Sequence, residues 1–588
     1  MIIDLMKKRF YFTYITISVL VIILFTGCNL HMKRTASLPP IATRHTEWQQ
    51  TLTPGQEVAS TPSALKTSEV IQPQPDTPDD NTGIDSALIY LHPGLPTSLV
   101  DALNIPSSNR VESQENADVS VWPGRRDGQQ PNLPDSTWVY ALVAPFYTLS
   151  DGVSLSAIKS LWQGEDVADL NFSQILVTPE VYALMSEIMG SPTGAQVGVV
   201  SDKALRELAL TNQPILSLIP FEELTPEWKI LRVDGLSPID DVFSTEEYPL
   251  AVPIWVESKS RHRINSLPAT NYNIDQRTVL LMTGVTALVR ATAHRMDIQG
   301  NTYPGKDIYP WFTAADLVHI SNEAPFYENC PTPDPFQPDL IFCSSPDRIE
   351  LLEHISADII ELSGNHLLDY GLPAINLTLD MYEERGWTTY AGGWDLQVAR
   401  TPAKITHNGN QLAFIGCNPV GPPAAWATDT QPGSAPCGDY QWMLDEIQVL
   451  RADGYLPIVT LQYDEDYIAY PSPKMEADFK RIADAGAIVV NGSQAHVPMS
   501  LIFYENSFLH FGLGNLFFDQ MQVVYNNTEM QGTREGFIDR LVFYDGQLVS
   551  IELLTTMLED YARPRPMNLS ERTALLTRIF RIALDAYQ

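Results

Sequence analysis

The feature that most constrains the fold is a repeated alternation of apolar runs and polar loops between residues 278 and 560. Each run is long enough for one strand and ends in small and polar residues. The runs are VLLMTGVTALVR (279–290), LVHISNEAPF (317–326), IIELSGNHLLDYG (359–371), LPIVTLQYDEDY (456–467), AIVVNGSQAHVP (487–498) and SFLHFGLGNLFFDQ (507–520). Helix-like stretches lie between them, at Pro346–His354, Ile375–Arg385, Tyr440–Ala452 and Lys474–Ala485. Strands that alternate with helices predict a layered α/β fold whose polar loops meet at one edge of the sheet.

Three of these loops carry side chains of the kinds that bind metal ions. Glu323, Asn365, His366 and His496 offer a carboxylate, an amide oxygen and two imidazoles after predicted strands, and such groups are common ligands of divalent metals. Each also has a structural alternative, because Asn365 can cap the following turn and either imidazole can hydrogen-bond within its loop. Asp369 can orient His366 or accept from backbone amides, as turn aspartates do.

The order and spacing of the loops resemble the capsule-synthesis CapA family, the polyglutamate capsule proteins, which have the calcineurin-like metallophosphatase fold. The resemblance covers nearly all of residues 278–550. It implies a layered metallophosphatase-like domain, a role in capsule (polyglutamate) synthesis or export, and catalytic roles for His366, His496 and Asp369. The matching residues are Glu323, Gly364, Asn365, His366, Asp369, Tyr370, Gly371, His496, Gly514, Asn515, Phe518 and Asp519.

Three positions at which the family has metal ligands carry other residues here. Val285 stands where the family has an aspartate, and Gln462 and Gln494 stand where it has histidines. Valine cannot bind a metal, and a glutamine carbonyl binds zinc or iron far more weakly than imidazole does. The implied metal ligands that remain are Glu323, Asn365, His366 and His496. This reduced set implies at most one weakly bound divalent ion (manganese, magnesium or zinc), or none.

A second, smaller α/β domain is predicted at residues 83–266. STWVYALVAPFYTL (136–149) predicts a strand, SDGVSLSAIKSLWQGE (150–165) a Ser-capped helix, and EEYPLAVPIWV (246–256) a closing strand. These stretches resemble a lobe of the type II solute-binding proteins, and an ordinary α/β domain without a ligand is the alternative. The predicted organisation is a signal peptide at 1–28, a linker at 29–82, this domain, a CapA-like domain at 278–560 and a C-terminal helix at 561–588.

The beginning of the chain has the pattern of a bacterial export signal. Three basic residues, at positions 7–9, precede an apolar run from Phe10 to Phe25, which is shorter than the roughly 20 residues of a membrane span. Thr26-Gly27-Cys28 follows and resembles a lipobox, which predicts acylation of Cys28 and an extracytoplasmic, membrane-anchored lipoprotein. An uncleaved N-terminal anchor is the alternative. The Pro-, Ser- and Thr-rich residues 29–82 predict a disordered tether.

The charge balance excludes one class of partner. The formal net charge is −34, from 37 basic and 71 acidic residues, whereas a nucleic-acid-binding protein needs a basic face. The partners implied by the family resemblance are a cell-envelope polymer or the capsule machinery, with the membrane contacted through the lipid anchor.

The remaining cysteines predict disulfide bonds. Besides Cys28 there are four, Cys330, Cys343, Cys417 and Cys437, and an even number in an exported protein favours two disulfides. We predict the local pairs Cys330–Cys343 and Cys417–Cys437. A four-cysteine zinc site is the rival interpretation, and the sequence has no Cys-x-x-Cys pair to support it.

Two functional hypotheses follow. The first is an envelope-attached, metal-dependent hydrolase or transferase of metallophosphatase type, which acts on a phosphoester or on capsule polymer with a depleted ligand set. The second is a non-catalytic envelope protein that binds an anionic ligand and retains a degenerate metal site.

Overall fold

The computed structural model describes residues 87–587 apart from 125–133, 169, 260–263, 265–266, 521–523, 526–527 and 530–531. The predicted signal peptide, Cys28 and the linker therefore lie outside the described residues. Within the described ranges, no helix combines the length and apolar character needed to cross a membrane. We refer to residues 87–259 as the N-terminal region and to residues 277–587 as the C-terminal region.

The N-terminal region is built on one ten-stranded sheet flanked by helices. The longest strand of this sheet is β4. The first half of β4 pairs with β10, and the second half pairs with β8 and β9, so β4 connects the two parts of the sheet. The strands are β1 (Ile89–Leu91), β2 (Arg110–Val111), β3 (Val119–Pro123), β4 (Ser136–Pro145), β5 (Gly152–Val153), β6 (Gln174–Val177), β7 (Val197–Val199), β8 (Ile215–Pro220), β9 (Trp228–Val233) and β10 (Ala251–Ser258). The helices are α2 (Thr97–Ala102), α3 (Leu155–Trp162), α4 (Pro179–Met189) and α5 (Asp202–Arg206).

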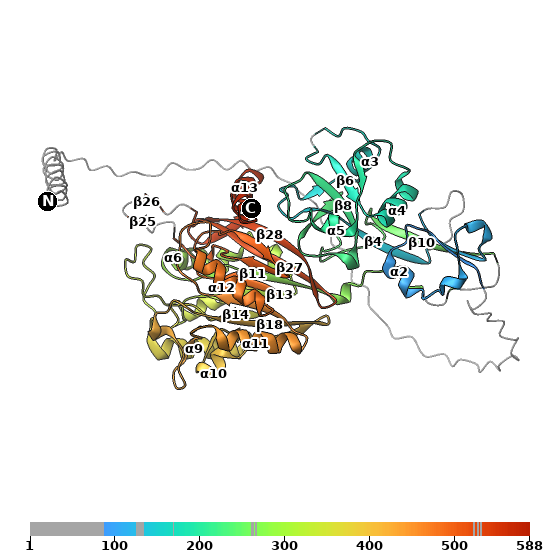
Figure 1. The fold of residues 1–588 in the computed structure, drawn as a ribbon. Coiled ribbons are helices and arrows are strands. Elements are labelled where there is room, and N and C mark those ends of the chain that lie inside the picture. Colours follow the sequence, from blue (N-terminus) through green and yellow to red (C-terminus); the bar gives the residue numbers. More distant parts are fainter. Residues whose placement is uncertain are drawn as a thin grey trace, which may run out of the picture. The chain divides into compact units, whose positions relative to one another are not determined.

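The C-terminal region contains two large sheets. The nine-stranded sheet contains β11 (Arg277–Thr283), β12 (Val285–Thr286), β13 (Leu317–Asn322), β14 (Ile359–Glu361), β15 (Thr388–Tyr390), β24 (Asn515–Phe517), β27 (Glu535–Tyr544), β28 (Gln547–Glu559) and β29 (Arg563–Pro566). The six-stranded sheet contains β17 (Ala403–His407), β18 (Asn410–Cys417), β20 (Leu456–Leu461), β21 (Val489–Gly492), β22 (Leu501–Tyr504) and β23 (Ser507–His510). Two two-stranded sheets pair β16 (Gly392–Gly393) with β19 (Gly433–Ser434) and β25 (Val524–Tyr525) with β26 (Thr528–Glu529). Strands β11, β27 and β28 run side by side in Figure 1.

Side chains that alternate along the strands assemble these sheets into four layers. In β11, Leu280 and Met282 join a core that contains Ile458 of β20, so the two sheets pack face to face. Leu281, between them, points to the opposite face and packs among the helices that cover the nine-stranded sheet. In β20 of the six-stranded sheet, Val459 likewise points away from the core between the sheets and packs in the cluster on the outer face of its own sheet. Because successive strand residues face opposite sides, apolar runs of this kind are buried on both faces. The predicted layered α/β fold with a smaller α/β region before it is confirmed.

Four helices of the C-terminal region overlap the predicted stretches 346–354, 375–385, 440–452 and 474–485, with differences at their ends, whereas the helices at 290–299, 309–313 and 396–400 were not predicted. The helices of this region are α6 (Arg290–Gln299), α7 (Tyr309–Thr313), α8 (Glu350–His354), α9 (Gly371–Glu384), α10 (Leu396–Arg400), α11 (Gln441–Ala452), α12 (Pro473–Asp484) and α13 (Leu569–Asp585). Helix α13 begins eight residues later than the start of the predicted 561–588 segment, because β29 first pairs with β28. The side chain of Asn568 and that of Glu571 then form a capping box.

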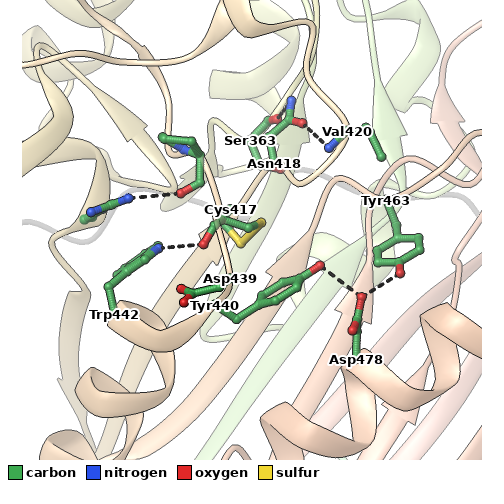
Figure 2. The surroundings of a disulfide bond; sticks show 12 residues. Ser363, Cys417, Asn418, Val420, Asp439, Tyr440, Trp442, Tyr463 and Asp478 are labelled. Atoms are coloured by element: carbon green, nitrogen blue, oxygen red, sulfur yellow. Dashed lines mark hydrogen bonds between the residues drawn. A yellow bond between two sulfur atoms is a disulfide. The ribbon is translucent and has the colours of Figure 1, made fainter.

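Both disulfides of the structure are the local pairs predicted from the sequence. Cys330–Cys343 has a Cα–Cα distance of 5.8 Å, and Cys417–Cys437 has one of 5.1 Å. Since all four sulfurs are bonded in pairs, the rival four-cysteine zinc site is not formed. Figure 2 shows that the second disulfide lies close to Asn418 and Ser363, which follow β18 of the six-stranded sheet and β14 of the nine-stranded sheet.

Candidate functional site

The predicted site residues follow the ends of parallel strands. Glu323 follows β13, the turn with Asn365 and His366 follows β14, and Gln462 follows β20. His496 follows β21 in the same way. We call these residues, together with Asp369 and Gln494, the strand-end site. The strands arrive from both sheets, because β13 and β14 belong to the nine-stranded sheet and β20 and β21 to the six-stranded sheet.

A glutamine amide joins two of the predicted oxygen ligands. Gln462 Nε2 donates to Glu323 Oε1 at 3.4 Å and to Asn365 Oδ1 at 3.2 Å. The turn before Asn365 packs closely against Glu323 because residue 364 is a glycine, where a Cβ would lie only 2.8 Å from the Cα of Glu323. Glu323 and Gln462 are buried, at 3% and 2% exposure. The oxygens that could bind a metal ion are therefore hydrogen-bonded to an amide N–H in this arrangement.

The two histidines are each oriented through Nδ1. His366 Nδ1 lies 2.6 Å from Asp369 Oδ2, and His496 Nδ1 lies 2.8 Å from Asn515 Oδ1. Burial lowers the pKa of His366, but the hydrogen bond to Asp369 and the nearby charges of Glu323, Asp369 and Glu465 raise it above its ordinary value overall. Asp369 also accepts from the backbone N–H of Phe342 at 2.7 Å. It therefore orients His366 and holds a backbone amide, which were the two structural alternatives for this residue.

Two aromatic rings and a guanidinium stand between the histidines. The ring of Phe342 lies 4.6 Å from that of His366, and the ring of Phe518 lies 5.2 Å from that of His496. These phenyl rings are 6.3 Å apart, and the guanidinium carbon of Arg290 lies 5.2 Å from one and 4.8 Å from the other. Such cation–π contacts favour a positive charge over the ring faces. The two imidazoles are thus linked through an aromatic bridge.

Arg290 is the functional candidate that sequence reasoning missed. It is only 5% exposed, begins α6 with a positive φ of 47°, and its Nε has no hydrogen-bond partner among the described residues. A non-glycine residue in this left-handed region is strained, and such strain is often concentrated at functional sites. Burial lowers the pKa of Arg290, while Asp519, Glu323, Tyr467 and Glu465 oppose the shift. The available signal was its position at the end of the first strand-and-loop run, at residues 279–290.

The substituted positions differ in what surrounds them. Val285 is 1% exposed and belongs to an apolar cluster that also contains Phe342 and Phe518. Gln494 is 3% exposed, its Nε2 lies 3.5 Å from His496 Nε2, and its Oε1 has no hydrogen-bond partner in the part of the chain that the structure describes. Val285 therefore contributes packing, whereas Gln494 retains a polar contact with a predicted ligand.

A buried polar layer lies beneath these loops. Glu361 at the end of β14 is 1% exposed and accepts from the hydroxyls of Ser363 and Ser493, the latter at 2.8 Å. Burial raises the pKa of Glu361, although these hydroxyls oppose the shift. Asn418 Nδ2 donates to the backbone oxygen of Ser363 at 3.0 Å beside the Cys417–Cys437 disulfide (Figure 2). This layer ties the two sheets together directly under the strand-end site.

The donor set does not fit a dinuclear metal pair. Such a pair needs several anionic or imidazole ligands around two ions, and Val285, Gln462 and Gln494 replace three of them. In the part of the chain that the structure describes, no group of three or more His, Cys, Asp and Glu side chains is placed to hold a metal ion. One hard cation with oxygen ligands from Glu323, Asn365 and a reoriented Gln462 is the arrangement that the residues could still supply.

The C-terminal region thus consists of two packed sheets with oriented imidazoles and a carboxylate at their strand ends. Residues 278–520 match the family model described as "Bacterial capsule synthesis protein PGA_cap". This match confirms the family resemblance that the sequence indicated for this part of the chain.

Curated relatives match the same region. The "Capsule biosynthesis protein CapA" of Bacillus anthracis is 22% identical over 277 residues, which are 46% of this chain and 67% of that protein. The "PGA biosynthesis protein CapA" of Bacillus subtilis is 22% identical over 218 residues, 36% of this chain and 56% of that protein. A "Probable polyglutamine synthesis accessory protein" of Mycobacterium tuberculosis is 25% identical and covers 36% of this chain and 58% of its own length. The chain thus spans between 56% and 67% of these relatives.

Three solved structures with similarity to parts of the chain illustrate what the comparison finds. A hypothetical protein from Thermus thermophilus is 13% identical with a TM-score of 0.29, covering 48% of this chain and 100% of that one. The calcineurin-like phosphoesterase YfkN of Bacillus subtilis is 13% identical with a TM-score of 0.27, covering 53% and 98%. An ABC-type phosphate transport receptor from Vibrio cholerae is 12% identical with a TM-score of 0.25, covering 30% and 88%.

Proposed function

We propose that the chain takes part in capsule polymer synthesis or export at the outer side of the cell membrane, as an anchored assembly protein rather than a two-metal phosphoesterase. The PGA_cap match and the names of the curated relatives support the process. The basic and apolar leader with Thr26-Gly27-Cys28 supports the location and the lipid anchor. The polymer implied by the family is polyglutamate, and the capsule machinery is the proposed partner.

One contact carries the choice against a two-metal enzyme. The amide of Gln462 donates to both Glu323 and Asn365, so a neutral hydrogen-bond donor lies where an imidazole ligand is expected in the family. Without two ions, the site lacks the usual means of activating a nucleophile and stabilising the leaving oxygen. We propose at most one weakly bound divalent ion here.

A metal-dependent hydrolase is the second candidate, and one observation favours it. Both imidazoles are oriented by a partner on Nδ1, which is how metal-binding histidines are commonly held. His366, His496 and Asp369 would be its catalytic residues.

The two candidates are separated by metal content and activity. We expect purified protein to contain less than one tightly bound metal per chain by elemental analysis, and to show low phosphoesterase activity with added manganese. His366→Ala and His496→Ala should change this activity little, with Glu328→Gln, an exposed glutamate outside the site, as the matched control. Two tight metals per chain, or robust activity lost in both histidine variants, would establish the hydrolase instead.

The location has its own test. Mass spectrometry of the membrane-extracted protein should show a chain that begins at a diacylated Cys28. An intact Met1, or a mature chain that starts at another residue, would contradict the proposed anchor while leaving the proposed role of the strand-end site untouched.

A further inference from the structure

A cavity of about 220 Å³ lies between strand β9 of the N-terminal region and strand β28 and helix α13 of the C-terminal region. We call it the seam cavity. Its apolar wall includes Phe146, Ile230, Leu576 and Phe580, and its charged wall consists of Asp151, Lys229, Arg232, Glu552 and Arg572. It is distinct from the strand-end site, since the two share no lining residue.

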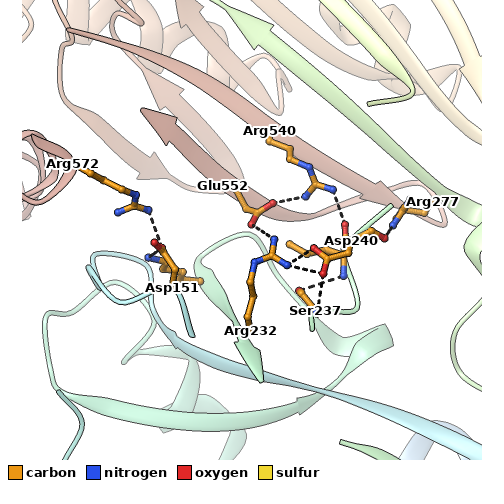
Figure 3. Close-up of polar contacts among 10 residues, drawn as sticks. Asp151, Arg232, Ser237, Asp240, Arg277, Arg540, Glu552 and Arg572 are labelled. Carbon is orange, nitrogen blue, oxygen red and sulfur yellow. Dashed lines mark hydrogen bonds and ion pairs between the residues drawn. The ribbon is translucent and has the colours of Figure 1, made fainter. Parts of the chain in front are cut away.

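Cations outnumber carboxylates in the wall of the seam cavity. Three cationic side chains face two carboxylates. The next charged groups outward do not change this balance, because Asp240 pairs with Arg232 and Arg540 pairs with Glu552 (Figure 3). One positive charge is therefore left without a matching carboxylate, and a bound monoanion would balance it.

Two of the three cationic side chains share one carboxylate, that of Asp151. Lys229 Nζ lies 2.7 Å from Asp151 Oδ1 and 2.9 Å from the backbone oxygen of Thr148. Arg572 Nη2 donates to the same Oδ1 of Asp151 at 2.8 Å (Figure 3). An ammonium has three N–H donors and a guanidinium has five, so these contacts leave donors of both side chains for another acceptor at the cavity wall.

Lys229 is poorly compensated despite these contacts. Its side chain is 16% exposed. Burial and the nearby guanidinium of Arg572 lower its pKa to about 8, although Asp151 opposes the shift. A carboxylate placed beside both cations would add the missing negative charge, and charge-assisted hydrogen bonds of this kind are stronger than neutral ones.

We propose that the seam cavity binds a small organic acid that has one carboxylate and an apolar body. The carboxylate accepts hydrogen bonds from Lys229 and Arg572, and the apolar body packs against Phe146 and Phe580. The cavity is smaller than the roughly 300–1,000 Å³ of drug-sized pockets, so the ligand is a small one. Because the walls come from both regions, a bound acid stabilises their contact and raises the melting temperature by mass action.

Benzoate is a suitable probe, with benzamide as its neutral isostere and inorganic phosphate as an anion without an apolar body. The full chain in detergent is titrated with each compound by calorimetry and by thermal unfolding. We expect benzoate to bind with a dissociation constant of millimolar order or below and to raise Tm, and benzamide and phosphate to have no comparable effect. Equal binding of benzamide, equal binding of phosphate, or no binding of benzoate overturns the proposal.

Variants place the binding in the cavity. Lys229→Met and Arg572→Met should each weaken benzoate binding by about tenfold or more, as expected for loss of a charge-assisted hydrogen bond. Arg572→Lys should retain part of the affinity. Arg578→Met is the matched control, because Arg578 lies on the same helix but pairs with Glu535 instead of lining the cavity. Unchanged affinity in both Met variants overturns the proposal.

A footprint on the unaltered protein tests the same site without any variant. The lowered pKa of Lys229 makes part of its amine neutral at pH 8, so an amine-acetylating reagent should modify it there. Benzoate should protect Lys229 from acetylation, as followed by mass spectrometry, and benzamide should not. Equal modification with and without benzoate contradicts the proposed position of the carboxylate.

Discussion

The strand-end site and the seam cavity are both rich in charged groups, but their charge balance is opposite. At the strand-end site, the charges of Glu323, Asp519 and Glu465 act on the guanidinium of Arg290, and Asp369 adds a further carboxylate beside His366. In the seam cavity, three cationic side chains face two carboxylates. The first region is also filled by two phenyl rings, whereas the second retains a cavity of about 220 Å³.

The difference shows that a motif can keep its place in a fold while its chemistry changes. The strand-end loops retain the family's spacing, yet their centre is closed by amide hydrogen bonds and aromatic contacts. The seam cavity has no sequence motif, and its groups come together only in the folded chain. Asp151 and Arg572, for example, are 421 residues apart. We therefore expect perturbations to separate the two regions.

The largest expected effect is on the strand-end side, from loss of the Cys417–Cys437 disulfide. The double substitution Cys417→Ala and Cys437→Ala opens a loop of 20 residues, which costs about 3 kcal/mol on the chain-entropy estimate. Both cysteines are fully buried, so a packing loss adds to this cost. Gln462, whose backbone N–H donates to Cys417 at 3.1 Å, should also lose order.

Urea unfolding measures this cost, and the other disulfide is the control. Opening Cys330–Cys343, a loop of 13 residues, removes a similar entropy term of about 3 kcal/mol but less buried packing. The Cys417–Cys437 variant should therefore be the less stable of the two, with benzoate binding at the seam cavity retained at low temperature. A smaller loss than in the control variant would show that the disulfide does not support the strand-end layer.

The next effect is acid destabilisation from His319, which lies in the core below the strand-end site. His319 is 1% exposed, and burial lowers its pKa to about 3. The unfolded chain binds a proton at this residue below about pH 6.5, whereas the folded chain does so only near pH 3. Stability is thus lost as the pH falls from about 6.5 towards 3, by about 3 kcal/mol at pH 4.

His319→Phe removes this titration and should flatten the acid limb of the stability profile between about pH 6.5 and 4. Phe414→Leu is the control, because the Phe414 ring stacks on His319 and its loss lowers stability without removing a titrating group. Denaturant unfolding across the pH range gives both profiles. An equally steep acid limb in His319→Phe would mean that other groups cause the acid sensitivity.

The third prediction restores a ligand at the strand-end site. Gln462→His places an imidazole between Glu323 and Asn365, where the amide now donates to both. Imidazole binds zinc or manganese more tightly than a glutamine carbonyl, so we expect about a tenfold or greater gain in metal affinity. Gln462→Leu removes the same hydrogen bonds without adding a ligand and should show no gain. Calorimetry with each metal decides, and unchanged affinity in Gln462→His would mean that the neighbouring oxygens are not available to a metal.

Local sequence signals predicted the positions of the strands, their polar ends and the disulfides. The sequence predicts a Ser-capped helix within 150–165 without placing the cap; Ser154 caps α3, with its hydroxyl 3.2 Å from the backbone N–H of Ala157, and Val153, which the prediction included in the helix, lies in β5. Alternating burial follows directly from the apolar runs, because each strand residue can face only one of two sides. These features depend on a few neighbouring residues, which a sequence displays. The predicted domain limits and the lipid anchor stay predictions.

The side-chain contacts inside the strand-end site and around the seam cavity could not be predicted from local sequence signals. Phe342 lies in the Cys330–Cys343 loop, and nothing near it in the sequence indicates that its ring meets Phe518 and the guanidinium of Arg290. Likewise, nothing near Lys229 in the sequence distinguishes it from other strand lysines. Only the folded chain shows that Arg572 of α13 contacts the same carboxylate, that of Asp151. Contacts of this kind depend on how distant elements pack.

The smallest expected effect, and the sharpest test of the charge difference, is Glu552→Gln in the seam cavity. This change removes the carboxylate that contacts Arg540 and, at 3.7 Å, Arg232. The side chain of Glu552 is 25% exposed, so loss of the pairs should cost only about 1 kcal/mol of stability. The excess of cations in the wall rises, so benzoate should bind several-fold more tightly and more sensitively to salt. Glu559→Gln is the matched control, because Glu559 lies on the same strand but pairs with Arg563 and Arg565 instead of lining the cavity; it should lose similar stability without any gain in benzoate affinity. Weaker benzoate binding in Glu552→Gln than in the control would mean that Glu552 positions the cations, and that the excess charge is not what attracts the acid.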